Sequence, residues 1–292
     1  MPAVDIHQHL WPEPFLEALA RRTRPPRLRG SLLELTGESA GEVDLGAHGL
    51  DGRLRLLDRC EIDVAVVSLQ PTLGLDQLPE DERGELVHVW ESGIRELARA
   101  ADGRIVPLAP GLEHEGFAGA CVGASALMDL DGIADRLDGL KRRGAFLFVH
   151  PGSVHPGVQP SSARPDWWPS VVDYTAQMQA AYAAWLAEGG ERWPRLRVVF
   201  AILAGGGPFQ LERLRSQGVS SRELPRDNVF FETASYGRRA LDLCLATFGV
   251  DQLLYGSDTP VIDPEPTLAA VRGFGDAVSD ALCRQNPTRL LS

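Results

Sequence analysis

The stretch VDIHQHL, residues 4–10, begins the chain with a short apolar strand that carries two histidines, His7 and His9, two positions apart. Two similar junctions follow, because AFLFVHPG places His150, and LLYGSDTP places Asp258, at the end of an apolar run. Imidazole and carboxylate groups are costly to bury at the inner ends of strands unless something there uses them. Three imidazoles and one carboxylate form a donor set suited to a divalent transition metal, with zinc as the first choice. The pattern predicts a metalloenzyme.

Short β-branched or aliphatic runs alternate with segments of helical period along the chain. The runs are residues 3–9, 62–70, 104–109, 118–126, 145–150, 196–203, 228–234 and 253–258. Eight strands alternating with helices indicate an α/β protein, either a parallel (β/α)8 barrel or a doubly wound sheet. The barrel is favoured because the polar residues end the first, fifth and eighth runs, which a closed barrel gathers at one mouth. The chain has no GxGxxG or GxxxxGK[ST] motif, which weakens the nucleotide-binding alternative.

Two segments interrupt this alternation. Residues 29–50 contain two short apolar runs on either side of the turn-prone GESAG, and we predict a small β-hairpin inserted after the first strand. His48 lies in this insertion and is expected to be a surface-loop histidine. Residues 151–169, rich in proline, are predicted to form a lid loop over the mouth. An α/β barrel of this length is commonly one unit, so we expect a single domain over residues 1–292.

Composition excludes several classes of function. The 292 residues are 44% hydrophobic and 24% charged, as in ordinary globular proteins. A net charge of −11 argues against nucleic acid or an anionic membrane surface as a partner. No apolar run approaches the roughly 18 residues that span a membrane. Four dispersed cysteines without a CxxC pair, and a first strand without a leader before it, indicate a cytoplasmic location.

Strand geometry relates the candidate ligands to one another. Residues two apart share a strand face, so His7 and His9 should point inward while Ile6 and Gln8 face the helices. His150 is expected to point inward by the same parity in its own strand. Taken alone, paired histidines are often hydrogen-bonded core residues, and an aspartate before Thr-Pro is often a turn residue. Four such groups at one mouth favour a metal site.

Six motifs, in order along nearly the whole chain, carry a resemblance to a known family. They are VDIHQHLWPEP, IDVAVVS, LFVHPG, VVFAILAGGGPFQLERL, LLYGSDTP and NPTRLL. Together they resemble the amidohydrolase-related (amidohydrolase 2) family, in the branch that includes aminocarboxymuconate-semialdehyde decarboxylase. The resemblance implies a distorted (β/α)8 barrel that binds one zinc-like ion through His7, His9, His150 and Asp258. It also suggests a homodimer.

One position departs from the family pattern. Members usually carry a histidine at the end of strand six, where FAILAGGGPF places Ile202, and shifting the register by one or two residues brings in no histidine. In the resembled decarboxylases this histidine moves a proton or stabilises charge on the substrate, and losing a general acid or base slows a reaction about 10²–10⁴-fold. Asp258 could double as the base, His155 could act from the lid, or the substrate could need no proton relay.

Further polar and aromatic groups are candidates for holding a substrate. They lie near strand ends, on the lid or beside the HxH strand: Trp11, Ser68, Gln70, Arg164, Trp167, Ile202, Glu232, Thr233 and Ser235. Arg164 would pair with a carboxylate and Trp167 with a ring, although the tryptophan would equally serve to pack the lid. We therefore predict a metal-dependent decarboxylase of a small aromatic or unsaturated carboxylic acid. The alternatives are a metal-dependent hydrolase of a lactone or amide, and a catalytically silent ligand-binding barrel.

Overall fold

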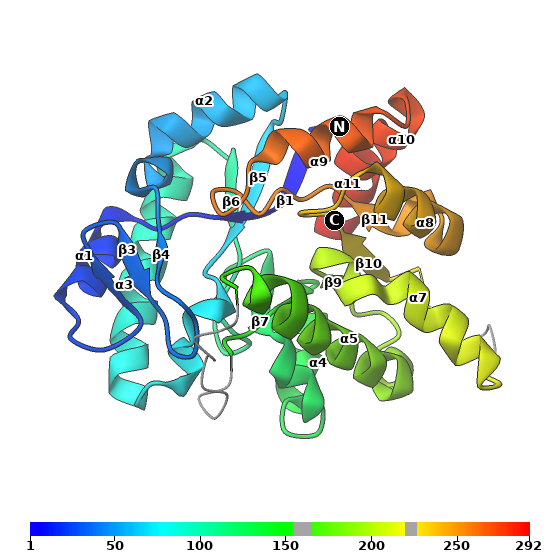
Figure 1. Cartoon of the computed structure of the whole chain (residues 1–292), viewed down its shortest axis with the longest axis horizontal. Coiled ribbons are helices and arrows are strands. Elements are labelled where there is room, and N and C mark those ends of the chain that lie inside the picture. Colours follow the sequence, from blue (N-terminus) through cyan, green and yellow to red (C-terminus); the bar gives the residue numbers. More distant parts are fainter. Residues whose placement is uncertain (155–164, 220–226) are drawn as a thin grey trace.

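Eight parallel strands form the centre of the molecule in the computed structural model, which describes residues 1–154, 165–219 and 227–292. The strands form two sheets, ordered β1-β5-β6 and β11-β10-β9-β8-β7 (Figure 1). Their bounds are β1 Val4–His9, β5 Val64–Ser68, β6 Ile105–Pro107, β7 Gly119–Gly123, β8 Phe146–His150, β9 Val198–Phe200, β10 Val229–Glu232 and β11 Leu253–Leu254. Each of the eight predicted runs contains one of these strands, and the α/β class is confirmed.

The two sheets approach each other at two isolated parallel bridges, Gln8 with Thr259 and Ala109 with Ala120. The ladders of the described residues therefore do not form one closed sheet. The last strand is also shorter than predicted, because the chain leaves the ladder after Leu254 and turns toward β1.

Helices lie around the outside of the two sheets (Figure 1). The longer ones are α1 Glu13–Arg21, α2 Leu50–Cys60, α3 Glu80–Ala100, α4 Ala134–Arg142, α5 Tyr174–Ala184, α7 Ile202–Ser216, α8 Arg238–Phe248, α9 Pro264–Arg272 and α11 Asn286–Leu291. Two shorter helices are α6 Gly190–Arg192 and α10 Asp276–Asp280. No described helix combines the length and the apolar composition that crossing a bilayer would require.

The insertion after β1 differs from the predicted single hairpin. It contains three antiparallel strands, β2 Arg27–Arg29, β3 Leu32–Glu34 and β4 Gly41–Glu42, and then a short 3-10 helix over Leu45–His48. The expectation for His48 was wrong, because its side chain is only 4% exposed. Its ring stacks on Trp11, with centroids 4.6 Å apart and an interplanar angle of 4°.

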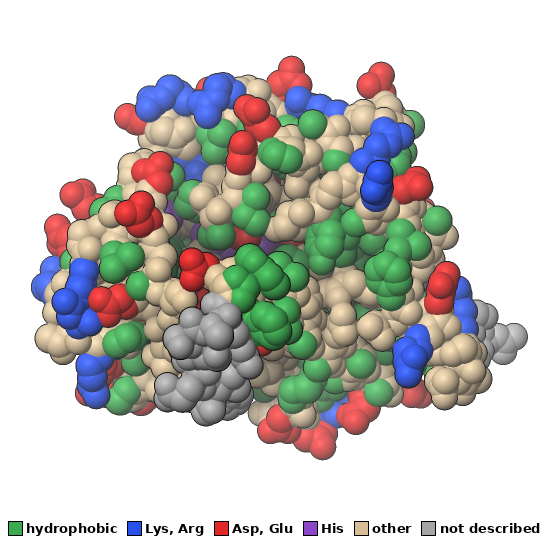
Figure 2. Space-filling model, in the orientation of Figure 1, with side chains coloured by type: hydrophobic (Ala, Val, Ile, Leu, Met, Phe, Trp, Pro, Cys, Tyr) green, Lys and Arg blue, Asp and Glu red, His purple; other side chains and the backbone are tan. Residues whose placement is uncertain are grey.

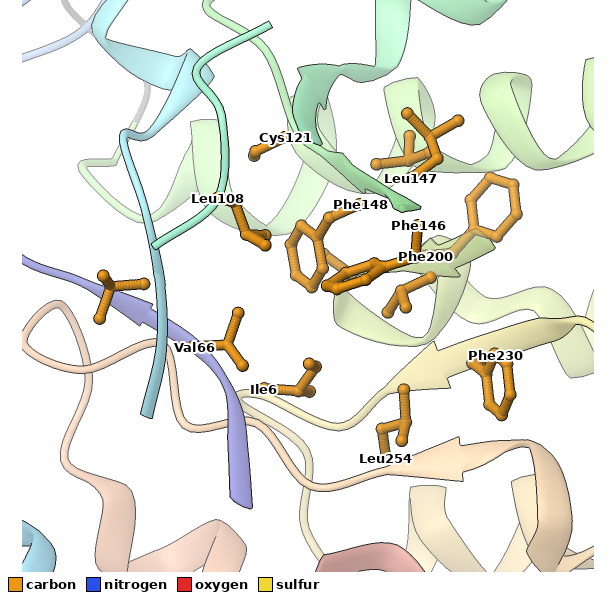
Figure 3. Close-up of a cluster of buried hydrophobic side chains, with 14 of the residues drawn as sticks. Ile6, Val66, Leu108, Cys121, Phe146, Leu147, Phe148, Phe200, Phe230 and Leu254 are labelled. Carbon is orange, nitrogen blue, oxygen red and sulfur yellow. The ribbon is translucent and has the colours of Figure 1, made fainter. Parts of the chain in front are cut away.

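Buried side chains fill the space between the strands (Figure 3). The register of β1 against β5 shifts between Asp5 and Gln8, so that a β-bulge interrupts the alternation of β1. Ile6 therefore joins the buried cluster beside Val66, and its predicted orientation toward the helices was wrong. Gln8 meets α2 as expected, since its side-chain oxygen accepts a hydrogen bond from Arg53 Nη1 at 2.8 Å.

Candidate metal centre

Four side chains from three strand ends converge on one point. Ligand atoms of His7, His9, His150 and Asp258 all lie within 4.8 Å of one another. The Nε2 atoms of His7 and His9 are 3.2 Å apart, and Oδ1 of Asp258 lies 3.0 Å from the second of them. The three imidazoles are at most 5% exposed, whereas the Asp258 side chain is 15% exposed. Figure 2 shows histidine side chains in a hollow near the middle of this face.

The outer nitrogen of each imidazole has an acceptor. Nδ1 lies 2.9 Å from Glu232 Oε2 for His7, 3.0 Å from the Ser68 carbonyl oxygen for His9, and 2.8 Å from the Pro151 carbonyl oxygen for His150. An acceptor at Nδ1 places the proton there, so each Nε2 presents a lone pair to the shared centre. Two such lone pairs 3.2 Å apart repel each other unless a cation or a proton lies between them. The donor set and its outer partners therefore fit a divalent metal ion.

Asp258 is held against β1 by the backbone. It adopts a left-handed φ of 62°, which aspartate tolerates better than most residues. Its amide donates to the His7 carbonyl oxygen at 2.8 Å, and the His9 amide donates to the Thr259 carbonyl oxygen at 2.7 Å. These bonds place the carboxylate next to the HxH pair.

A buried polar network behind β1 fixes the backbone of the HxH pair. Asp5 accepts hydrogen bonds from the His7 amide at 3.1 Å and from Gln8 Nε2 at 2.7 Å. Arg53, 1% exposed, donates from Nη2 to the His9 carbonyl oxygen at 3.0 Å. Burial raises the pKa of Asp5 to about 6. Sequence reasoning missed this network, since no local pattern sets Arg53 apart from the other basic residues of its helix.

The carboxylates around His7 control its protonation. Burial alone would lower the pKa of His7, but the Glu232 and Asp258 carboxylates outweigh it and raise that pKa to about 9. At His150, burial and the neighbouring His7 and His9 hold the pKa well below its usual range. Burial would raise the pKa of Asp258, but the imidazoles around it lower that pKa on balance.

Residues 103–292 match the family model described as amidohydrolase. The chain belongs to the amidohydrolase family. This confirms the family that the sequence motifs indicated, and the match contains both His150 and Asp258.

Solved structures share the fold of this amidohydrolase along nearly its whole length. IDCase of Metarhizium anisopliae is 20% identical, with 99% of this chain and 97% of that chain covered and a TM-score of 0.80. A 5-carboxyvanillate decarboxylase from Novosphingobium aromaticivorans, complexed with manganese and 4-hydroxy-3-methoxy-5-nitrobenzoic acid, is 15% identical over 99% and 96%, with a TM-score of 0.74. A dihydroxybenzoic acid decarboxylase from Polaromonas sp., with manganese and the inhibitor 2-nitroresorcinol, is 16% identical over 99% and 96%, also with a TM-score of 0.74. No curated protein matches the chain.

Glu232 contacts the outer nitrogen of His7, whereas the sequence pattern placed it among the groups that would contact substrate. Its Oε2 accepts from the Ile202 amide at 3.1 Å in addition to His7, and its Oε1 accepts from the Ala234 amide. Ile202 reaches this carboxylate in a left-handed conformation with φ 45°, and residues 203–206 continue with positive φ. A strained conformation of this kind in a β-branched residue persists only where the surroundings impose it. The amidohydrolase thus has a hydrocarbon side chain at position 202 and a backbone amide there that donates to Glu232.

Several of the other predicted substrate groups have hydrogen-bond partners or close polar neighbours within the protein. Trp11 Nε1 donates to Gln70 Oε1 at 2.6 Å, and the Gly256 amide donates to Thr233 Oγ1 at 3.3 Å. Ser68 Oγ lies 3.3 Å from His9 Nδ1, so it too has a neighbour within the site. Trp167 is 55% exposed and stacks on Trp168. His155, Arg164 and most of the predicted lid lie outside the described residues.

Proton release should accompany metal binding to this amidohydrolase. Because the pKa of His7 is raised from 6.5 to about 9, the stabilisation from its proton is fully present below pH 6.5 and is lost as the pH rises through about 9. A metal ligand must be a neutral imidazole, so binding between pH 7 and 8 should release about one proton. Titration calorimetry in two buffers of different ionisation enthalpy measures this number. Equal binding enthalpies in the two buffers would mean that no proton is released, and would contradict the assignment of His7 as a metal ligand.

Proposed function

We propose that this amidohydrolase is a metal-dependent decarboxylase of a small aromatic or unsaturated carboxylic acid. The observation that carries the proposal is the convergence of His7, His9, His150 and Asp258 within 4.8 Å, with the outer nitrogen of each imidazole on an acceptor. The names of two structural relatives, decarboxylases of 5-carboxyvanillate and dihydroxybenzoic acid, favour this substrate class. We further propose one (β/α)8 barrel domain over residues 1–292, with zinc as the resident ion.

Each group of residues at the site would have its own role in the reaction. The divalent ion, when bound, would act as a Lewis acid that polarises an oxygen of the substrate. Asp258 would be a ligand and also the proton acceptor, since it is the most exposed of the four and faces all three imidazoles. Glu232 and the carbonyl oxygens of Ser68 and Pro151 would keep the imidazoles oriented. His155 is proposed as a second proton carrier.

Substrate contacts are proposed along the wall that Trp11 and Gln70 form beside the HxH strand. Gln70 also borders a cavity of about 350 Å³ beyond the ends of β5 and β7, but none of the four candidate ligands lines that cavity. Ser68, Thr233, Ile202, Arg164 and Trp167 complete the proposed set. Ile202 would present an apolar surface to the substrate.

Hydrolysis of a lactone or amide is the second candidate, because the same donor set can activate water and a fold alone does not fix the chemistry. Incubating the zinc- or manganese-loaded protein with benzoate-like acids, muconate-like acids and lactones separates the two. Release of carbon dioxide from an acid supports decarboxylation, whereas acid production from lactones alone overturns it. If the protein turned over none of these compounds, a catalytically silent ligand-binding barrel would be the better explanation.

The Ile202→His variant tests whether the absence of a histidine at position 202 limits the reaction rate. Restoring a general acid or base should raise the rate of decarboxylation about 10²-fold or more in Ile202→His. Histidine tolerates the left-handed backbone better than isoleucine, so the variant should fold. Ile202→Ala, which adds no proton carrier, is the matched control. Equal rates for Ile202→His, Ile202→Ala and the parent enzyme would show that the reaction needs no relay at this position.

A further inference from the structure

The buried ring of His48 packs on Trp11, next to the end of the strand that carries His7 and His9. The backbone amide of Trp11 donates to its Nδ1 at 3.1 Å, which makes Nδ1 an acceptor. The ring is therefore neutral with its hydrogen on Nε2. Nε2 is fully buried, and within the described part of the chain it has no hydrogen-bond partner. A buried donor without a partner destabilises a protein because the group has lost its hydrogen bonds to water, so its retention needs an explanation.

Three contacts fix the position of this ring relative to the metal ligands. Trp11, on which the ring stacks, follows the ligand His9 by two residues. Nη2 of Arg53 donates both to the His9 carbonyl oxygen at 3.0 Å and to the Ala47 carbonyl oxygen at 3.1 Å. One guanidinium thus ties the residue before His48 to the end of the HxH strand. The stacking and the Trp11 amide then hold the imidazole in one orientation.

We propose that His48 is a substrate-binding residue whose Nε2–H donates to an anionic oxygen, most simply a carboxylate oxygen, of the acid bound at the metal centre. This inference rests on the proposed function and adds to it a residue from the inserted segment. A neutral donor suits this task because it recognises an oxygen acceptor without placing a second cation beside the metal. Trp11 cannot supply the donor, since its Nε1 is already bonded to Gln70.

Two substitutions of His48 test the roles of its two ring nitrogens separately. His48→Asn places an amide oxygen where Nδ1 accepts from Trp11 and removes the distal donor. His48→Gln places an amide N–H at the distance of Nε2 from the backbone and so retains that donor. Both variants should bind one equivalent of zinc as the parent does. Their melting temperatures report separately on any structural role.

The test is calorimetric titration of the zinc-loaded proteins with benzoate, which supplies an aromatic carboxylate. His48→Asn should weaken benzoate binding about tenfold or more, and His48→Gln should stay within about threefold of the parent. Unchanged affinity in His48→Asn, or no benzoate binding by the zinc-loaded parent, would overturn the role of His48. A parent protein that holds no zinc would instead defeat the proposed function itself, so the two failures are distinguishable.

Discussion

Replacing His150 with alanine is expected to abolish turnover and to release the metal. Loss of an outer partner of a ligand typically weakens metal binding about 10–100-fold, and loss of the ligand itself should exceed that. The fold should survive, since β8 remains paired with β7 on one side and β9 on the other. Metal content after dialysis and decarboxylation rate are the two measurements.

The matched control for this experiment is His88→Ala. His88 is exposed on α3, outside the group of four, so metal content and rate should not change. A His150→Ala protein that keeps a full equivalent of metal and the parent's rate would exclude His150 as a ligand.

Glu232→Gln is expected to produce the second large effect. The carboxylate is fully buried and accepts from His7 Nδ1 and from the Ile202 and Ala234 amides. An amide has one oxygen and would turn a donor toward one of these N–H groups. Metal affinity should fall about 10–100-fold, and the free energy of unfolding should fall by about 3 kcal/mol.

Metal titration and urea unfolding of the Glu232→Gln protein measure these two quantities. Glu265→Gln is the control, because Glu265 is exposed in the first turn of α9 and is not in the group of four. If Glu232→Gln left metal affinity and stability both unchanged, Glu232 would not orient His7.

The four candidate ligands could be identified from sequence because each lies within or just after a short apolar run, and that pattern is local. His7 and His9 share a strand, and the alternation of eight strands with helices indicates that Asp258 meets them. The bulge in β1 could not be predicted, since it depends on the register with β5. His7 and His9 still point to the candidate metal centre, whereas Ile6 joins the buried cluster and Asp5 accepts a hydrogen bond from the side chain of Gln8.

Partners far along the chain account for what sequence reasoning missed. Glu232 reaches His7 across 225 residues, and Arg53 reaches Gln8 across 45. His48 reads as an ordinary loop residue until its contact with Trp11 is known. Ile202 was recognised as a departure, but its left-handed backbone and the hydrogen bond from its amide to Glu232, 30 residues away, have no local sequence signal.

The most direct test of the metal centre is a crystal structure of the protein after loading with manganese or zinc, with anomalous scattering recorded at the metal edge and elemental analysis of the same sample. The account predicts about one equivalent of metal, with a single anomalous peak in contact with His7, His9, His150 and Asp258. Less than about a tenth of an equivalent after reconstitution, or a peak elsewhere on the molecule, would contradict it.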